Sequence, residues 1–257
     1  MNALLQGKNI VIMGVANHRS IAWGIAQSLH QAGANLIFTY QGERLRENVE
    51  ELTKKLGGEP LLVSCDVTKD EDVEAAFGLI KEKVGVIHGI AHCIAFAKTE
   101  ELDGEYVNTS REGYALAQDI SAYSLVAVAR AARPLMTEGG SIVTMTYLGG
   151  ERVIQNYNVM GVAKAALDAS VRYLANDLGK ENIRVNAISA GPIRTLAAKG
   201  IRNFNAVLKE IEEKAPLRRT IDQSDVGDTA LFLFSHLSRG ITGEILHVDA
   251  GYSIRGY

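Results

Sequence analysis

Two tyrosines and a lysine in the middle of the chain have the types and spacing needed to move or stabilise a proton. In the stretch "YNVMGVAK", residues 157–164, Tyr157 precedes Lys164 by seven positions. A helix turns by ~100° per residue, so seven steps return to nearly the same face, two turns and ~10 Å further along. The two side chains can therefore address one ligand from the same side.

A third candidate, Tyr147, ends an apolar segment just upstream. The phenol of a tyrosine has a pKa near ~10, and a nearby ammonium favours the phenolate, which makes the hydroxyl a better donor to a developing oxyanion. The three residues thus predict proton chemistry. The alternative is that Tyr147 and Tyr157 are packing residues and Lys164 is a solvated helix lysine.

The segments around these residues alternate between strand and helix patterns. Strands are predicted at 8–15, 34–40, 60–67, 89–95, 141–148, 184–191 and 244–251. Most are continuous apolar runs, which is typical of parallel strands covered on both faces. The sequence therefore predicts an α/β fold: one doubly wound Rossmann-type domain, residues 1–257, with a seven-stranded parallel sheet and helices on both faces. Such a sheet binds ligands beyond the carboxyl ends of its strands.

Longer helix patterns cover 111–137, 158–179 and 222–236. Ser20 lies where the first helix needs an N-cap residue. Thr68, followed three positions later by Glu71, predicts a capping box at the start of another helix.

The bulk properties exclude several classes of protein. A net charge of −3 gives no basic field for nucleic acid, and no apolar run approaches the ~18–20 residues that span a membrane. The N-terminus is typical of an opening strand rather than a signal peptide. Cys65 and Cys93 lie in apolar runs without metal-ligand spacing, and His88, His92 and His247 are interpreted as structural. We expect a cytoplasmic protein with no metal site.

A dinucleotide site is predicted where the first strand meets the first helix. Gly14 would let the backbone approach a phosphate, and the free N–H groups at the helix start, by Ser20, would meet a pyrophosphate. The alternative is a tight strand-to-helix turn without a ligand.

The ends of the second, third and fourth predicted strands indicate how the remaining parts of the dinucleotide would be bound. The second strand ends at Thr39–Gly42 with neither an acid for ribose hydroxyls nor a base for a 2′-phosphate. We expect NADH, with NADPH left open. Asp66 could accept from an adenine amino group while Val67 packs on the ring, and Ile94 could line the cofactor. Strand-end capping and core packing are the alternatives.

Several longer motifs carry a family resemblance. They are "GVANHRSIAWG" (14–24), "FTYQGERL" (38–45), "HCIAFA" (92–97), "DGEYVNTSREGY" (103–114), "YNVMGVAKAALDASVRYLANDLG" (157–179), "IRVNAISAGPIRTLAA" (183–198) and "GEILHVDAGY" (243–252). Through them the whole chain resembles the short-chain dehydrogenase/reductases. Within that superfamily it looks like the bacterial enoyl-acyl-carrier-protein reductases of fatty-acid synthesis, the triclosan-sensitive type.

The resemblance implies a reaction. Ordinary members of the superfamily reduce carbonyls and have tyrosine four positions before the lysine, where this chain has Met160. The displaced tyrosine marks the enoyl reductases. They reduce trans-2-enoyl-acyl-carrier-protein to acyl-carrier-protein by hydride transfer from NADH to C3, the last step of the elongation cycle. Tyr157 would hydrogen-bond the thioester oxygen, and Lys164 would hold the nicotinamide ribose. A carbonyl reductase and a dinucleotide sensor without turnover remain as alternatives.

The resemblance also implies the contacts of each ligand. The cofactor-binding residues would be Gly14, Ser20, Ile21, Gln41, Asp66, Val67, Ile94, Lys164, Ile193, Arg194, Thr195, Leu196 and Ala197. The substrate-binding residues would be Ala97, Tyr147, Tyr157, Met160, Ile201 and Phe204.

A lid is expected at about 194–216, where small, apolar and basic residues mix; a plain surface helix is the alternative. The local basic cluster comprises Lys199, Arg202, Lys214, Arg218 and Arg219. We expect some of these residues to meet the acidic carrier protein, although a solvated charged face would look the same. The resemblance further implies a homotetramer.

Overall fold

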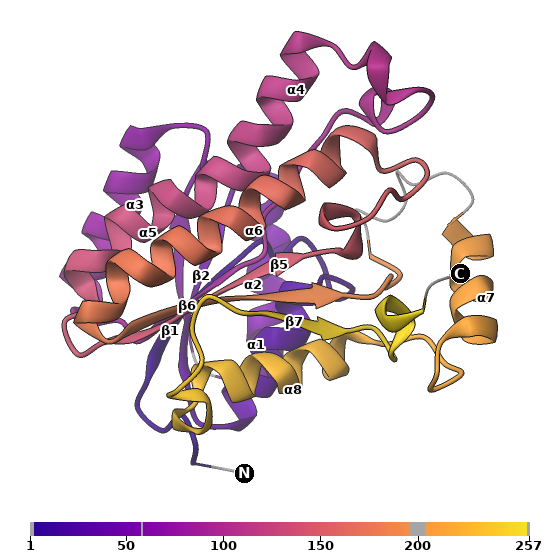
Figure 1. Ribbon diagram of the computed structural model, residues 1–257. Helices are drawn as coiled ribbons and strands as arrows, with labels where there is room; N and C mark the ends of the chain where they lie inside the picture. The colour runs from indigo at the N-terminus through magenta and orange to yellow at the C-terminus, as the bar shows by residue number, and fades with distance from the viewer. Residues whose placement is uncertain (1–2, 58, 196–203, 256–257) are drawn as a thin grey trace.

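One parallel sheet organises the chain. The computed structural model describes residues 3–57, 59–195 and 204–255. Seven strands pair in the order β3-β2-β1-β4-β5-β6-β7, and every pair is parallel (Figure 1). The strands are β1 Asn9–Met13, β2 Asn35–Tyr40, β3 Leu61–Ser64, β4 Gly89–His92, β5 Gly140–Thr146, β6 Ile183–Ala190 and β7 Ile245–Val248. The predicted seven-stranded parallel sheet is confirmed.

Helices cover both faces of this sheet (Figure 1). They are α1 Ile21–Gln31, α2 Glu43–Thr53, α3 Asp70–Lys83, α4 Arg111–Gln118, α5 Ser124–Ala132, α6 Asn158–Leu178, α7 Phe204–Lys214 and α8 Gln223–Phe234. Ile10 and Ile12 of β1 join the core formed with α1 and α8, whereas Val11 and Met13 join the core formed with α3, α5 and α6. Successive side chains of a strand point to opposite faces, so a strand covered on both faces must be apolar throughout.

The helix predicted over 111–137 is interrupted. A π-helical turn, Asp119–Tyr123, separates α4 from α5, and a 3₁₀ turn follows at Arg133–Leu135. Ser121 in the π turn is fully buried; its hydroxyl accepts from the Phe96 N–H at 2.9 Å and donates to the Phe96 carbonyl at 3.0 Å. The turn thus fastens the segment that follows β4.

Two predicted caps act differently. Ser20 is the N-cap residue of α1, but its hydroxyl accepts from the N–H groups of Ala16 and Asn17, at 3.0 Å each, and so shapes the loop instead of the helix. The predicted capping box at Thr68 is wrong, since α3 begins after Lys69. The Thr68 hydroxyl donates to Asp66 Oδ1 at 2.7 Å, because an ionised carboxylate is the stronger acceptor.

No helix within the described ranges is long and apolar enough to cross a membrane. The same residues contain no cluster of three or more His, Cys, Asp or Glu side chains placed to hold a metal ion.

Candidate active site

The carboxyl edge of the sheet gathers most of the residues predicted for the site. Because all strands are parallel, the segments that follow them meet at this edge. The described members are Gly14, Ser20, Ile21, Gln41, Asp66, Val67, Ile94, Ala97, Tyr147, Tyr157, Met160, Lys164, Ile193, Arg194 and Thr195. Leu196, Ala197 and Ile201 lie outside the described residues.

The order of the strands reverses between β1 and β4, and Gly14 lies at this switch point. Its φ is +92°, and a Cβ there would stand 2.1 Å from the Cys93 carbonyl oxygen. The loops after β1 and β4 can therefore approach only through glycine. This cradle fits a dinucleotide at the crevice, as the strand order predicts.

The start of α1 presents the free N–H groups that a pyrophosphate needs. Ser20 holds the preceding loop in place, and Gln223 of α8 donates to the Ser20 carbonyl at 3.0 Å. Gly24 has a packing role: a Cβ there would be 2.6 Å from Gln223 Cβ, so this glycine lets α1 and α8 approach.

Asp66 and Gln41 meet at the far end of the crevice. Burial raises the pKa of Asp66, but hydrogen bonds from Thr68 and Gln41 and the charge of Lys69 outweigh it, so the net pKa is lowered. The carboxylate is thus ionised and able to accept from an amino group. Val67 is buried in the core, which restricts it to packing.

Lys164 is buried, so the alternative of a solvated helix lysine is wrong. Its side chain is 5% exposed, and Nζ donates to the Met145 carbonyl of β5 at 2.7 Å. Burial lowers its pKa to about 8, while Asp168 opposes the shift. Near neutral pH the side chain is therefore a largely protonated ammonium in a dry part of the site.

Tyr157 occupies the N-cap position of α6, and its ring packs edge-on against Tyr147, with centroids 4.9 Å apart and planes at 75°. The expectation that Lys164 would favour the phenolate is wrong. Burial, followed by the influence of Tyr147 and Asp168, raises the pKa of Tyr157, and burial raises that of Tyr147 to about 12. Tyr157 is accordingly a neutral O–H donor.

The turn that encloses this pair was not predicted from the sequence. Leu148–Gly150 lies on the first turns of α6. A Cβ on Gly161 would be 2.8 Å from the Gly149 carbonyl oxygen, and one on Gly149 would be 2.4 Å from the Tyr157 ring. The signal was the "LGG" directly after Tyr147, whose glycines permit this contact.

Met160 is buried in a small apolar cluster with Ala117, Val159 and Ala163, against which Ala97 and Tyr157 pack. Three of the predicted substrate residues are therefore neighbours. Met160 occupies space one turn before Lys164 without offering a hydroxyl.

The opposite side of the site is more exposed. Ile193, Arg194 and Thr195 follow β6, and Phe204 begins α7. Ile193 and Phe204 are half-buried. The Tyr252 hydroxyl reaches Glu210 of α7 at 3.5 Å, a contact that the sequence did not indicate.

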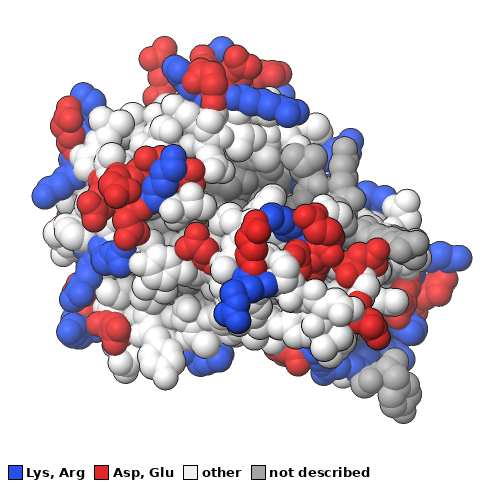
Figure 2. All heavy atoms as spheres, turned by 90° about the horizontal axis from the view of Figure 1, so that it is seen from above, with Lys and Arg blue, Asp and Glu red and all other residues white. Residues whose placement is uncertain are grey.

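Described members of the basic cluster have local partners. Lys214 pairs with Glu210 at 2.9 Å, Arg219 forms two 2.8 Å hydrogen bonds to Asp225, and Arg218 donates to the Glu213 carbonyl. Lys199 and Arg202 lie outside the described residues. On the face in Figure 2, side chains of both signs are interleaved.

The three histidines that were interpreted as structural, His88, His92 and His247, have partners in the fold. His88 meets Glu138 at 3.1 Å and His247 meets Glu151 at 3.0 Å. His92 lies between Thr144 and Ser124, and burial followed by the charge of Lys164 lowers its pKa to about 3. These contacts support the structural interpretation.

Comparisons with known proteins agree with this geometry. A family profile described as "Enoyl-(Acyl carrier protein) reductase" matches residues 14–253. The chain is 70% identical to "Enoyl-[acyl-carrier-protein] reductase [NADH] FabI" of Bacillus subtilis, over 99% of both chains. It is 59% identical to the [NADPH] FabI of Staphylococcus aureus MRSA252, over 96% of this chain and 97% of that one.

A solved structure gives the same result. The Bacillus cereus enoyl-acyl carrier protein reductase with NADP+ and indole naphthyridinone is 68% identical, covers 99% of this chain and 100% of its own, and superimposes with a TM-score of 0.98. The chain belongs to the enoyl-(acyl carrier protein) reductase family.

Proposed function

We propose that this protein reduces trans-2-enoyl-acyl-carrier-protein to acyl-carrier-protein with NADH. The observation that carries the proposal is the placement of the buried donors. Met160 fills the position one turn before Lys164, and the phenol of Tyr157 lies at the start of α6, beside Ala97. The substrate oxygen that this phenol binds therefore lies away from the Met160 position, where the catalytic tyrosine of a carbonyl reductase would be.

The residues of the crevice fit a dinucleotide. Gly14 and the start of α1 would hold the pyrophosphate, Asp66 and Gln41 the adenine end, and Lys164 the nicotinamide ribose. When bound, the cofactor supplies the hydride.

The protein's own groups act on the substrate oxygen. As C3 of the enoyl thioester gains hydride, negative charge develops on the thioester oxygen as an enolate, and the reaction is completed when C2 takes up a proton. The neutral Tyr157 hydroxyl donates a hydrogen bond to this oxygen, and the Lys164 ammonium adds positive charge nearby. One such donor is worth about 3–4 kcal/mol, or 10²–10³ in rate. Tyr147 packs against Tyr157 and keeps its ring in place.

An assay separates this function from the alternatives. The protein is mixed with NADH or NADPH and either a crotonyl or an acetoacetyl thioester. Oxidation of the reduced cofactor with the crotonyl thioester alone supports the enoyl reductase. Oxidation of the cofactor with the acetoacetyl thioester alone supports a carbonyl reductase. Cofactor binding without oxidation of either supports a sensor.

The preferred cofactor is NADH. Gln41 and Gly42, at the end of β2, offer no positive charge to a 2′-phosphate. The comparison of kcat/KM with NADH and NADPH tests this preference.

The segment 194–216 is proposed as the substrate lid. In its described part, Phe204 is half-buried on α7, and Leu208 and Ile211 anchor that helix to the body of the protein. Ile201 and Phe204 would cover the acyl chain. Changing Phe204 to Ala should raise KM for long acyl chains more than for crotonyl thioester.

The carrier protein is proposed to dock on the basic cluster near this lid. Lys214 and Arg219 are engaged by Glu210 and Asp225, so the main contribution is assigned to Lys199 and Arg202. The double reversal Lys199→Glu/Arg202→Glu should raise KM for carrier-bound substrate and leave KM for a small thioester unchanged. An unchanged KM for both substrates contradicts the docking site.

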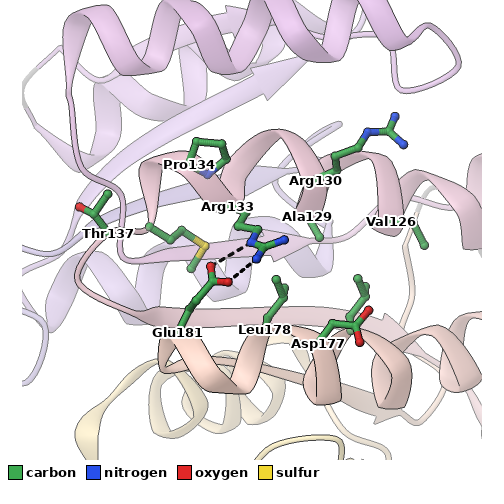
Figure 3. Close-up of a pocket in the computed structure, with 11 residues that line it drawn as sticks. Val126, Ala129, Arg130, Arg133, Pro134, Thr137, Asp177, Leu178 and Glu181 are labelled. Carbon is green, nitrogen blue, oxygen red and sulfur yellow. Dashed lines mark hydrogen bonds and ion pairs between the residues drawn. The ribbon is translucent and has the colours of Figure 1, made fainter.

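A homotetramer is proposed, with α5 and α6 in one interface. An open pocket of about 760 Å³ lies between these helices, lined by Val126, Ala129 and Leu178 and by the Arg133–Glu181 ion pair (Figure 3). Tyr173 of α6 is 77% exposed nearby. Light scattering should give the tetramer mass, and Tyr173→Glu should lower it.

The protein is proposed to act as one domain in the cytoplasm. Cys65 and Cys93 are both free thiols, and burial raises the pKa of Cys65 to about 11 and that of Cys93 to about 12. Such unreactive thiols suit a reducing compartment. Fractionation of the source cells tests the location.

A further inference from the structure

Lys164 is a buried cation whose hydrogen bond among the described residues goes to a neutral group: Nζ donates to the Met145 carbonyl at 2.7 Å. A carbonyl orients the ammonium but does not balance its charge. A buried ammonium without a counter-charge tends to lose its proton.

Asp168 lies one helical turn after Lys164, on the same face of α6. Its side chain is buried, at 4% exposure, and Oδ1 has no hydrogen-bond partner within the described parts of the chain. A carboxylate in this position is the natural partner of the ammonium.

The turn that encloses Tyr157 also encloses Asp168. A Cβ on Gly150 would be 2.9 Å from Asp168 Oδ2 and 3.1 Å from the Ala165 nitrogen. Gly150 therefore lies directly over the carboxylate and shuts it off from solvent. The hydroxyl of Thr146, at the end of β5, is also buried and lowers the pKa of the Asp168 carboxyl by hydrogen bonding.

The other titratable groups around the pair leave Asp168 as the balancing anion. Those that act on Lys164 or Asp168, or respond to them, are His92, Cys93, Glu151, Tyr157 and Arg172. His92 is neutral and Cys93 remains a thiol near pH 7, because burial lowers the pKa of the first and raises that of the second. Glu151 is engaged by His247.

We propose that Asp168 is a positioning residue for the reductase: its buried carboxylate keeps Lys164 charged and directed toward the site. Asp168 acts through Lys164 and touches no reacting atom. This role deepens the proposed function. Only the kinetic test below rests on that function, and the NMR tests do not.

Removing the Asp168 carboxylate should change the pKa of Lys164 directly. Burial raises the pKa of Asp168, and although a hydrogen bond from Thr146 and the charge of Lys164 lower it, the net pKa is raised. In return, Asp168 raises the pKa of Lys164, which burial lowers to about 8. Side chains one helical turn apart have Cβ atoms ~5–6 Å apart, and an opposite charge within ~4–6 Å shifts a pKa by about one unit or more. Asp168→Asn should therefore lower the Lys164 midpoint by at least about one pH unit.

The experiment is an NMR titration of the full-length protein with ¹³Cε-labelled lysine, with the Lys164 signal assigned by its loss in Lys164→Arg. Asp168→Asn is compared with Asp168→Glu, which keeps the charge, and with Asp177→Asn, an exposed acid on the same helix. The inference expects a lowered midpoint only in Asp168→Asn. A folded Asp168→Asn protein with the wild-type midpoint overturns it.

A measurement on the wild type covers the case in which Asp168→Asn does not fold. The ¹³Cγ signal of Asp168 should report an ionised carboxylate near pH 7, where Lys164 is still largely charged. A protonated Asp168 near pH 7 overturns the inference.

Kinetics give a separate readout. The alkaline limb of kcat/KM should move to lower pH in Asp168→Asn and stay in place in Asp177→Asn. If the limb stays in place while the Lys164 midpoint falls, Lys164 does not control turnover and the proposed function is at fault. A fixed midpoint instead contradicts the role of Asp168.

Discussion

The two sides of the candidate site are built differently. On one side, β5, the Leu148–Gly150 turn and α6 bury Lys164 and Asp168 and partly bury Tyr157, in contacts that leave no room for a methyl group. On the other, the segment after β6 and α7 presents half-buried apolar groups and exposed ion pairs. Chemistry needs positions held to fractions of an ångström, whereas an acyl chain needs a surface that can adapt.

The largest effect is expected at the buried donor. Tyr157→Phe removes the hydroxyl but keeps the ring packing, so kcat should fall by about 10²–10³ while cofactor affinity stays near wild type. Tyr106→Phe, at a tyrosine that is 45% exposed, is the control and should leave kcat unchanged. Steady-state kinetics and cofactor titration measure both, and an unchanged kcat in Tyr157→Phe removes this residue from the chemistry.

The tight packing on that side can be broken with one methyl group. Gly161→Ala places Cβ 2.8 Å from the Gly149 carbonyl oxygen. Overpacking costs about 1–3 kcal/mol, against a gain of up to ~1 kcal/mol from helix propensity. We expect a net loss of about 1–2 kcal/mol in the free energy of unfolding, and a lower kcat.

Gly78→Ala is the matched control, since Gly78 is also helical but has nothing within 4 Å of its Cβ position. This variant should be as stable as the wild type or more so. If Gly161→Ala and Gly78→Ala have equal free energies of unfolding in urea titrations, the close contact between Gly161 and Gly149 is refuted.

The charge on the buried side gives a pH dependence. Burial lowers the pKa of Lys164 to about 8, so the ammonium is present below that pH and lost as the pH rises through it. Because Tyr157 stays protonated, kcat/KM should decline above about pH 8. A profile flat to pH 10 would show that Lys164 remains charged or plays no part.

The smallest effect is expected on the exposed side. Lys209 and Glu213 of α7 form a 3.8 Å pair with both side chains largely exposed. Such pairs contribute under about 0.5 kcal/mol. Lys209→Met should leave both kcat and the midpoint of thermal unfolding nearly unchanged, and a large drop in either would mean that α7 is more rigidly held than its exposure indicates.

The sequence was most informative where a pattern has one physical cause. Continuous apolar runs are typical of strands covered on both faces, and most of the seven strands were predicted from them. The seven-residue spacing predicted that Tyr157 and Lys164 belong to the start of one helix, and both lie at the start of α6.

Other features depend on contacts between distant segments. The role of Gly149 and Gly150 rests on how closely their turn approaches α6, and the raised pKa of Tyr157 rests on burial by that turn. Asp168 has an ordinary place in a helix pattern, and only the fold shows that its carboxylate is enclosed beside Lys164. The Thr68 capping box failed because a closer acceptor, Asp66, competes for the hydroxyl.

The central claim is that this site delivers hydride to C3 of an enoyl thioester whose oxygen is bound by Tyr157. The most direct test is a single turnover with NADH deuterated at the transferred position and crotonyl thioester in ordinary water. The account predicts a butyryl thioester with deuterium at C3 and none at C2, formed far more slowly by Tyr157→Phe. Deuterium at the thioester carbon, or no transfer at all, would contradict it.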